Sequence, residues 1–249
     1  MCFSCVTHID QTQTITYYGM MPDLPPILFL HGLATTSKRT WGDNGWFDLV
    51  LEAKRQAQAI DLPGHGEEYN SESDFSGSYL DFIESRITTE TVDAVAFSLG
   101  ARIVLKLASK NPSRFRKIVV AGVGDSLFEP DEEHGRKIFN AISGTGVDED
   151  PESHYFSQLA VHPDINGPYI AACLQMQDLS LSPQDLSKLR LPVLVVLGDK
   201  DFAGPATKLI EALPYADLVT LKGVDHFATP KDFNFIENAL KFINAEPNW

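Results

Sequence analysis

The sequence of 249 residues lacks several features that define other classes of protein. It contains no run of about 18 apolar residues, so no membrane-spanning helix is expected. It carries 20 lysine and arginine residues against 34 aspartate and glutamate residues, a net charge of −14. Because phosphate backbones are bound by basic surfaces, this balance argues against a nucleic-acid partner. The N-terminus also lacks the basic segment and apolar core of a secretory signal.

Cysteine is scarce, with three residues at positions 2, 5 and 173. Cys2 and Cys5 have the spacing of half a metal or redox site, but no second pair accompanies them. Two reduced thiols are therefore the preferred interpretation. A cytoplasmic, reducing location is the default expectation for such a chain.

What the sequence does contain is a regular alternation of short apolar runs and helical segments. Strands are expected at residues 27–30, 58–60, 92–97, 117–121, 191–197 and 218–221, with a hairpin over residues 6–20. Helices are expected at residues 46–55, 79–87, 99–111, 205–213 and 232–243. This order predicts an α/β fold in which helices cover both faces of a mostly parallel sheet.

The stretch from Gly122 to Leu189 interrupts this alternation. It has helical fragments and no convincing strand, and between Gly124 and Ser187 it holds twelve acidic and two basic residues. It has few aliphatic runs from which to build a core of its own. We therefore expect one domain over residues 1–249, with residues 123–189 as an insertion at one edge of the sheet.

Candidate catalytic residues stand where the predicted strands end. Ser98 lies between a strand and a helix with small neighbours, Ala96 and Gly100, as a nucleophile elbow requires. Asp201 and His226 follow two later strands. Parallel sheets bind ligands beyond the carboxyl ends of their strands, and serine hydrolysis needs a nucleophile, a base and an acid.

At these residues the chain resembles the α/β-hydrolase superfamily. The matching motifs are His31-Gly32, Asp61-Leu62-Pro63-Gly64-His65-Gly66, Ala96-x-Ser98-x-Gly100, Gly198-x-x-Asp201 and Asp225-His226-Phe227. They span almost the whole chain in the family's order. The first glycine of the usual elbow is replaced by Ala96, which weakens that motif taken alone.

The resemblance implies an eight-stranded, mostly parallel sheet, with residues 123–189 as a helical cap. It implies Ser98 as nucleophile, His226 as general base and Asp201 as the acid that orients His226. The backbone N–H groups of Leu33 and Leu99 would form the oxyanion hole. No metal and no cofactor are implied. Asp125 is the alternative acid, because some members of the superfamily place the acid after the preceding strand.

The expected reaction is hydrolysis of a small to medium carboxylic ester or thioester through an acyl-enzyme. Aromatic residues suggest an apolar pocket for this small-molecule substrate, and the candidate walls are Trp41, Phe97, Phe202 and Phe227, with Tyr155, Phe156 and Met176 from the cap. The sequence leaves the oligomeric state open.

Two other functions stay open. The motifs also resemble a menaquinone-pathway synthase and C–C hydrolases of the superfamily, whose anionic substrates would need arginines such as Arg102 or Arg136. The acidic insertion argues against that reading. A non-catalytic ligand receptor is the third alternative.

Overall fold

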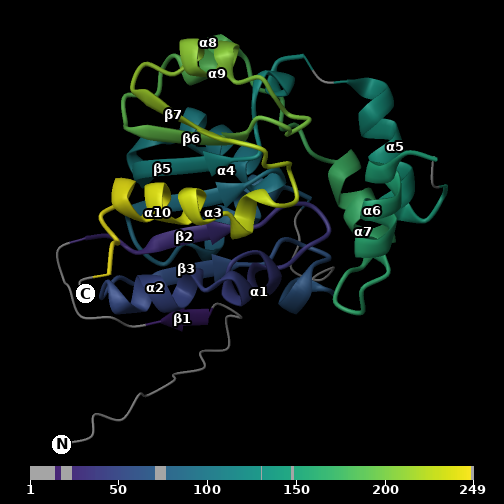
Figure 1. Ribbon diagram of the computed structural model, residues 1–249. Helices are drawn as coiled ribbons and strands as arrows, with labels where there is room; N and C mark the ends of the chain where they lie inside the picture. Colours follow the sequence, from purple (N-terminus) through teal and green to yellow (C-terminus); the bar gives the residue numbers. More distant parts are fainter. Residues whose placement is uncertain (1–14, 18–23, 71–76, 130, 147–148, 248–249) are drawn as a thin grey trace, which may run out of the picture.

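A computed structural model describes residues 15–17, 24–70, 77–129, 131–146 and 149–247 of the protein. Seven strands form one sheet in the order β1-β3-β2-β4-β5-β6-β7 (Figure 1). The strands are β1 (Ile15–Tyr17), β2 (Ile27–Leu30), β3 (Ala57–Ile60), β4 (Val92–Phe97), β5 (Phe115–Ala121), β6 (Val193–Gly198) and β7 (Ala216–Leu221). All pairs are parallel except β1 with β3, so the predicted α/β class is confirmed.

The predicted number of eight strands is not met in the described part of the chain, which holds seven. The first strand of the predicted hairpin, around Val6 and His8, lies outside the described residues. The second corresponds to β1, which pairs with β3: Ile15 lies opposite Ala59, and Tyr17 opposite Ala57.

Alternation along the central strands divides the core between the two faces of the sheet. In β4, Ala94 and Ala96 face one apolar cluster, whereas Val95 and Phe97 face the other. Successive side chains of a strand point to opposite faces, so a strand buried on both sides is mostly apolar. β2, β3, β4 and β6 are buried at every position.

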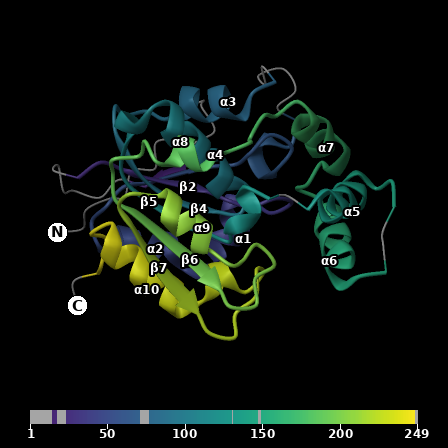
Figure 2. The same ribbon diagram turned by 90° about the horizontal axis from the view of Figure 1, so that it is seen from above.

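Helices cover both faces, as Figures 1 and 2 show. The first cluster is covered by α3 (Tyr79–Arg86), α4 (Leu99–Lys110), α8 (Pro183–Leu186) and α9 (Thr207–Ala212). The second is covered by α2 (Trp46–Glu52) and α10 (Phe233–Phe242). A short helix, α1 (Ser37–Thr40), follows β2. None of the helices in the described ranges is both long and apolar enough to cross a membrane.

The segment between β5 and β6 contributes three helices that pack on one another at one end of the sheet (Figure 2). They are α5 (Glu132–Ser143), α6 (Pro151–Ala160) and α7 (Gly167–Gln175). Ile142, Phe156 and Ile170 form a small apolar cluster among them. Leu186 and Leu189, further along the segment, belong instead to the main core. The helices that project from the sheet therefore end earlier than residue 189.

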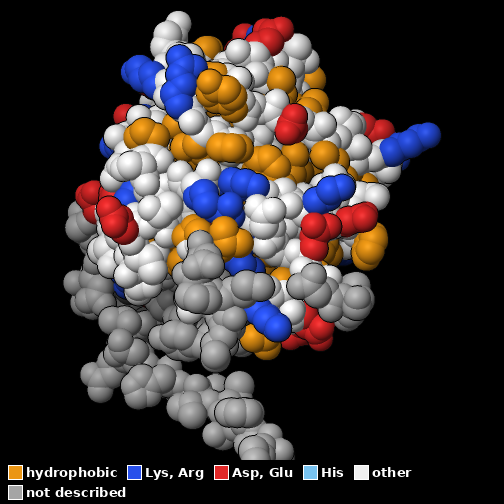
Figure 3. All heavy atoms as spheres, turned by 90° about the vertical axis from the view of Figure 1, so that its left-hand side faces the viewer, with side chains coloured by type: hydrophobic (Ala, Val, Ile, Leu, Met, Phe, Trp, Pro, Cys, Tyr) orange, Lys and Arg blue, Asp and Glu red, His pale blue; other side chains and the backbone are white. Residues whose placement is uncertain are grey.

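Buried charges lie at the amino end of β4. Asp93 is fully buried, and its carboxylate accepts hydrogen bonds from Arg55 Nη2 at 2.6 Å and from Arg116 Nε at 2.9 Å. Arg55 also donates to the carbonyl oxygens of Pro25 and Ile243. Figure 3 looks onto this end of the molecule, where lysine and arginine side chains lie near the centre of the face. The ion cluster therefore links β4 and β5 to the chain segments beside them.

Candidate active site

Ser98 occupies the sharp turn between β4 and α4. Its backbone has φ 52° and ψ −113°, a left-handed conformation that costs a non-glycine residue about 1–3 kcal/mol. The Ser98 N–H donates to the Ala121 carbonyl at 2.8 Å, which fixes the turn to β5. At Gly100 an added Cβ would lie 2.5 Å from the Leu30 carbonyl oxygen. The turn therefore needs a glycine there, because α4 starts against the end of β2.

The structure brings Ser98, His226 and Asp201 into one chain of hydrogen bonds. His226 Nε2 lies 3.0 Å from Ser98 Oγ. On the other side of the ring, Nδ1 lies 2.9 Å and 3.0 Å from the two carboxylate oxygens of Asp201. His226 and Asp201 are buried, whereas Ser98 is half-buried. Asp201 must accept from Nδ1–H, which leaves Nε2 free to accept the hydroxyl proton of Ser98.

The other carboxylates considered for the acid role have different partners. Asp125 Oδ1 accepts from the Leu209 N–H at 3.1 Å. Asp199 Oδ1 accepts from the Gly223 N–H at 2.7 Å, and Asp225 Oδ1 accepts from the Ala228 N–H at 2.8 Å. All three carboxylates therefore hold loop or helix backbone rather than the His226 ring.

Leu33 and Leu99 flank Ser98. Neither backbone N–H has an acceptor within the described ranges. Leu99 starts α4, where the first backbone N–H groups of a helix have no partner in the helix itself. Leu33 follows the end of β2. Two unpaired donors beside a serine hydroxyl have the chemistry of an oxyanion hole.

The loop that carries Leu33 is held by two buried histidines. His65 Nε2 accepts the Ala34 N–H at 3.0 Å, and His31 Nε2 accepts the Leu62 N–H at 3.0 Å. Each ring nitrogen Nδ1 donates to a backbone carbonyl, of Gly32 for His31 and of Pro63 for His65. An imidazole whose Nε2 accepts a hydrogen bond must be neutral. Burial accordingly lowers the pKa of both side chains, and that of His65 well below its ordinary value.

Aromatic rings surround the imidazole of His226. The Phe202 ring lies 4.3 Å from it and the Phe97 ring 4.8 Å, both inclined by less than 40°. Phe227 meets it edge-on at 5.6 Å. Rings in this arrangement restrict rotation of the imidazole and interact favourably with its protonated form.

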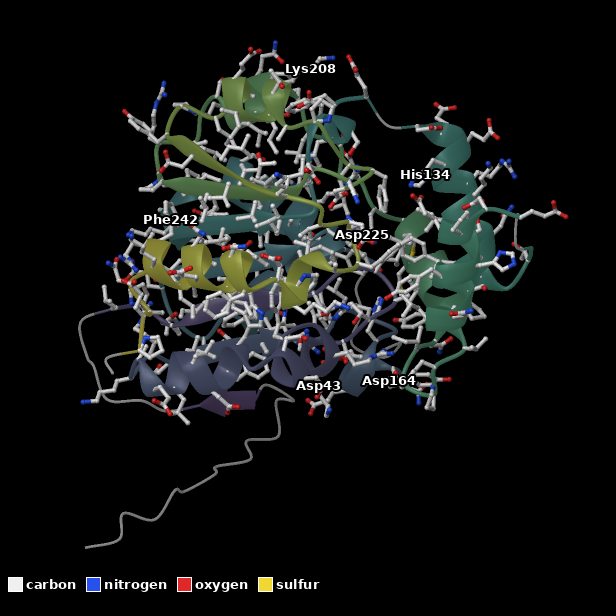
Figure 4. All side chains as sticks on the ribbon, in the orientation of Figure 1. Asp43, His134, Asp164, Lys208, Asp225 and Phe242 are labelled. Carbon is white, nitrogen blue, oxygen red and sulfur yellow. The ribbon has the colours of Figure 1, made fainter. Side chains whose placement is uncertain are left out.

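Two cavities meet at Ser98. The smaller, about 270 Å³, is lined by His226 and Phe97 on the sheet side and by Tyr155 and Phe156 of α6. The larger, about 830 Å³, extends beneath α5 and α7 and is lined by apolar side chains that include Ile138, Phe139, Leu174 and Phe202. His134 of α5 and Lys208 of α9, both labelled in Figure 4, also line it.

The predicted pocket residues divide into those that line these cavities and those that do not. Phe97 and Phe227 line the smaller cavity and Phe202 the larger. Trp41 lines neither: it is fully buried and packs against Phe29 at 5.4 Å and Trp46 at 5.1 Å, so the pocket prediction for Trp41 is wrong. Met176 is 55% exposed and lines neither cavity.

Of the two arginines considered as clamps for an anion, Arg102 lines the larger cavity and Arg136 does not. Arg102 donates to the Ser126 carbonyl, and burial lowers its pKa. Sequence reasoning missed Arg39 and Lys231, which line the smaller cavity. Neither belongs to a motif, and only the fold brings them to the cavity that Ser98 also lines.

Residues 27–234 match the sequence pattern described as the Alpha/beta hydrolase family. The chain belongs to this family, which confirms the resemblance found in the motifs.

Among characterised relatives, the chain is similar to the pimeloyl-[acyl-carrier protein] methyl ester esterase of Neisseria meningitidis serogroup A. The two sequences are 27% identical over an alignment of 212 residues, and the match covers 74% of this chain and 65% of that enzyme. The chain thus spans just under two thirds of that relative's length.

Solved structures share the fold across nearly the whole chain. Rv0554 from Mycobacterium tuberculosis superposes with a TM-score of 0.68 at 16% identity, covering 94% of each chain. The 2-hydroxy-6-oxo-6-phenylhexa-2,4-dienoate hydrolase of Rhodococcus sp. strain RHA1 superposes with a TM-score of 0.64 at 20% identity, covering 93% of each chain. At these identities the likeness concerns the fold.

Proposed function

We propose that this protein is a serine hydrolase that cleaves a small to medium carboxylic ester or thioester through an acyl-enzyme. The observation that carries the proposal is the unbroken hydrogen-bond chain from Asp201 through His226 to Ser98 Oγ. The similarity to a methyl ester esterase supports the ester as the bond attacked.

In the first half-reaction, Ser98 Oγ attacks the ester carbonyl carbon while His226 Nε2 takes the hydroxyl proton. The carbonyl oxygen becomes an oxyanion, held by the N–H groups of Leu33 and Leu99. The C–O bond to the alcohol then breaks, and the alcohol oxygen takes the proton from His226. A water molecule attacks the acyl-enzyme by the same route and releases the carboxylic acid and free Ser98.

The insertion acts as a cap in this proposal. α6 contributes walls to both cavities beside Ser98, and α5 and α7 contribute walls to the larger one. A substrate lodged between the sheet and these helices is shielded from water on that side. Shielding strengthens the interaction of the oxyanion with its donors.

The proposal is tested with a fluorophosphonate probe and a panel of p-nitrophenyl esters and matching thioesters of two to twelve acyl carbons. We expect the probe to label Ser98 and the esters to be turned over. In Ser98→Ala both signals should disappear while the circular dichroism spectrum and melting temperature stay unchanged.

Two results would contradict the proposal. Turnover at the wild-type rate in folded Ser98→Ala would exclude Ser98 as the nucleophile. A folded wild-type protein that neither reacts with the probe nor hydrolyses any ester would instead favour a ligand receptor, or an enzyme that eliminates or cleaves C–C bonds.

A further inference from the structure

The two cavities at Ser98 differ in charge, although the protein as a whole is acidic. Among the described residues, no aspartate or glutamate lines the smaller cavity, whereas Arg39 and Lys231 do. Four acidic residues line the larger one, Asp125, Glu129, Asp131 and Glu152. In a chain of net charge −14, a pocket with two cations and no acid is a local exception that favours an anionic ligand.

Not every hydrogen-bond donor of Arg39 has an acceptor. Its Nη2 donates to Asp164 Oδ1 at 2.9 Å, and its side chain is 21% exposed. Its Nε–H is buried and has no acceptor within the described part of the chain. A buried donor without an acceptor is costly, so the one ion pair with Asp164 does not satisfy every donor of Arg39.

Lys231 adds a second cation to the lining of the same cavity. It ends the short turn Thr229–Lys231, five residues after His226, and its side chain is exposed. No carboxylate of the described residues lies within ion-pair distance of its Nζ. A guanidinium and an ammonium group that share one cavity suit a carboxylate or another oxyanion.

The site geometry indicates which part of an ester would enter this cavity. The departing alcohol oxygen must take its proton from His226, and His226 lines the smaller cavity but not the larger. Leu99, whose N–H faces the oxyanion in the proposed mechanism, lines only the larger. The alcohol part therefore belongs to the smaller cavity, and the acyl part to the larger, apolar one.

We infer that the substrate is an ester of an apolar acid with an alcohol that carries an anionic group, and that Arg39 and Lys231 bind this group. The inference rests on the proposed function and names its substrate class. The charged end of the substrate is part of the leaving group, and it leaves with the alcohol when the acyl-enzyme forms.

The test compares two octanoyl esters that differ only in charge, one of glycolate and one of glycolamide. We expect kcat/KM for the glycolate ester to be about tenfold higher or more, since hydrogen bonds to charged groups are the strong ones. The preference should decrease with added sodium chloride. A half-ester with its carboxylate on the acyl part should show no such gain, because the four acids of the larger cavity outnumber its two cations, Arg102 and Lys208.

Three variants locate the effect. Arg39→Met and Lys231→Met should each lower the ratio of glycolate to glycolamide kcat/KM, mainly through the KM of the glycolate ester. Lys231 is exposed, so its replacement tests the inference even if Arg39→Met unfolds. Lys38→Met is the matched control, because Lys38 lies beside Arg39 in α1 and lines neither cavity.

Equal turnover of the two octanoyl esters would overturn the inference while leaving the proposed function intact. A preference that Lys38→Met reduces as much as Lys231→Met does would also overturn it, because the effect would then come from overall charge. If no ester is hydrolysed and the fluorophosphonate probe does not react, the proposed function and this inference fall together.

Discussion

The two ends of β4 differ in whether their polar groups have hydrogen-bond partners. At the amino end, Asp93 is fully buried and its charge is neutralised by Arg55 and Arg116, which also bond to nearby carbonyl oxygens. At the carboxyl end, Ser98 adopts a left-handed conformation, and the N–H groups beside it have no acceptor within the described ranges. One strand thus joins a buried ion cluster, whose carboxylate is paired with two arginines, to a strained site with free donors.

The difference shows what each end contributes. Groups that already have partners stabilise the fold and have no capacity left for a ligand. Strain and unpaired donors cost free energy in the empty protein, and a bound transition state can use them. Changes at the amino end should therefore alter stability, and changes at the carboxyl end should alter turnover.

The largest expected effect is on turnover at the carboxyl end. Ser98→Ala should lower kcat by roughly a millionfold, the size seen when a nucleophile of this type is removed. Stopped assays with p-nitrophenyl octanoate measure the rate, and thermal unfolding measures stability. A large fall in melting temperature would show that the elbow serine also supports the fold.

The amino end should behave in the reverse way. Asp93→Asn leaves two buried or half-buried guanidinium groups without their carboxylate, so unfolding free energy should fall by about 3–5 kcal/mol. Urea titration measures the loss, and kcat per folded molecule should not change. Asp48→Asn, on the exposed side of α2, is the control and should stay within about 0.5 kcal/mol of the wild type.

The pH dependence of stability should come partly from His31 and His65 beside the site. Both are neutral in the fold with lowered pKa values, whereas in the unfolded chain they bind protons near pH 6.5. The unfolded state thus binds more protons below that pH, and stability is lost as pH falls. The loss is about 1.4 kcal/mol per pH unit for each histidine until the lowered pKa is reached.

Urea titrations at pH 7.5 and 5.5 check this. His65→Asn should reduce the difference in unfolding free energy between the two pH values, and His154→Asn, an exposed change in α6, should not. Equal pH dependence in both variants and the wild type would mean that carboxylates alone produce the slope.

Smaller effects are expected from the rings around His226. Phe202→Leu removes the ring 4.3 Å from the imidazole, which should lower kcat by about two- to fivefold, because a ring face stabilises the imidazolium that forms during the reaction. Phe233→Leu, 73% exposed on α10, should leave kcat unchanged. If kcat is unchanged in Phe202→Leu, the Phe202 ring contributes packing and does not stabilise the imidazolium.

The smallest effect is expected from Ala96, which stands where the usual elbow has glycine. Ala96 is fully buried in β4, so Ala96→Gly should cost about 0.5–1 kcal/mol of stability and keep full activity. Thermal unfolding and the ester assay measure both. A loss of turnover would show that the turn depends on the Cβ of Ala96.

The motifs predicted the fold class and placed Ser98, Asp201 and His226 each in the segment that follows a strand, where the structure has them. Aromatic residues were less informative. Phe202 and Trp41 have similar sequence surroundings, a loop after a strand, but the turn of α1 directs Trp41 onto Phe29. Arg39 lies only two residues before Trp41, yet its place beside Ser98 depends on packing against Asp164, 125 positions later. No local sequence pattern predicts a contact between residues so far apart in the chain.

The insertion is attached to the rest of the molecule next to that same contact. The Gly66 N–H donates to the Asp164 carbonyl, the Asn166 N–H donates to the Gly64 carbonyl, and His65 forms a β-bridge with Ile165. Asp164, labelled in Figure 4, thus lies where the backbone of the insertion is hydrogen-bonded to the backbone of residues 64–66. His65 also accepts the N–H of Ala34, next to Leu33. One turn therefore anchors both the loop of Leu33 and the insertion, and a change that disturbs this turn should disturb both.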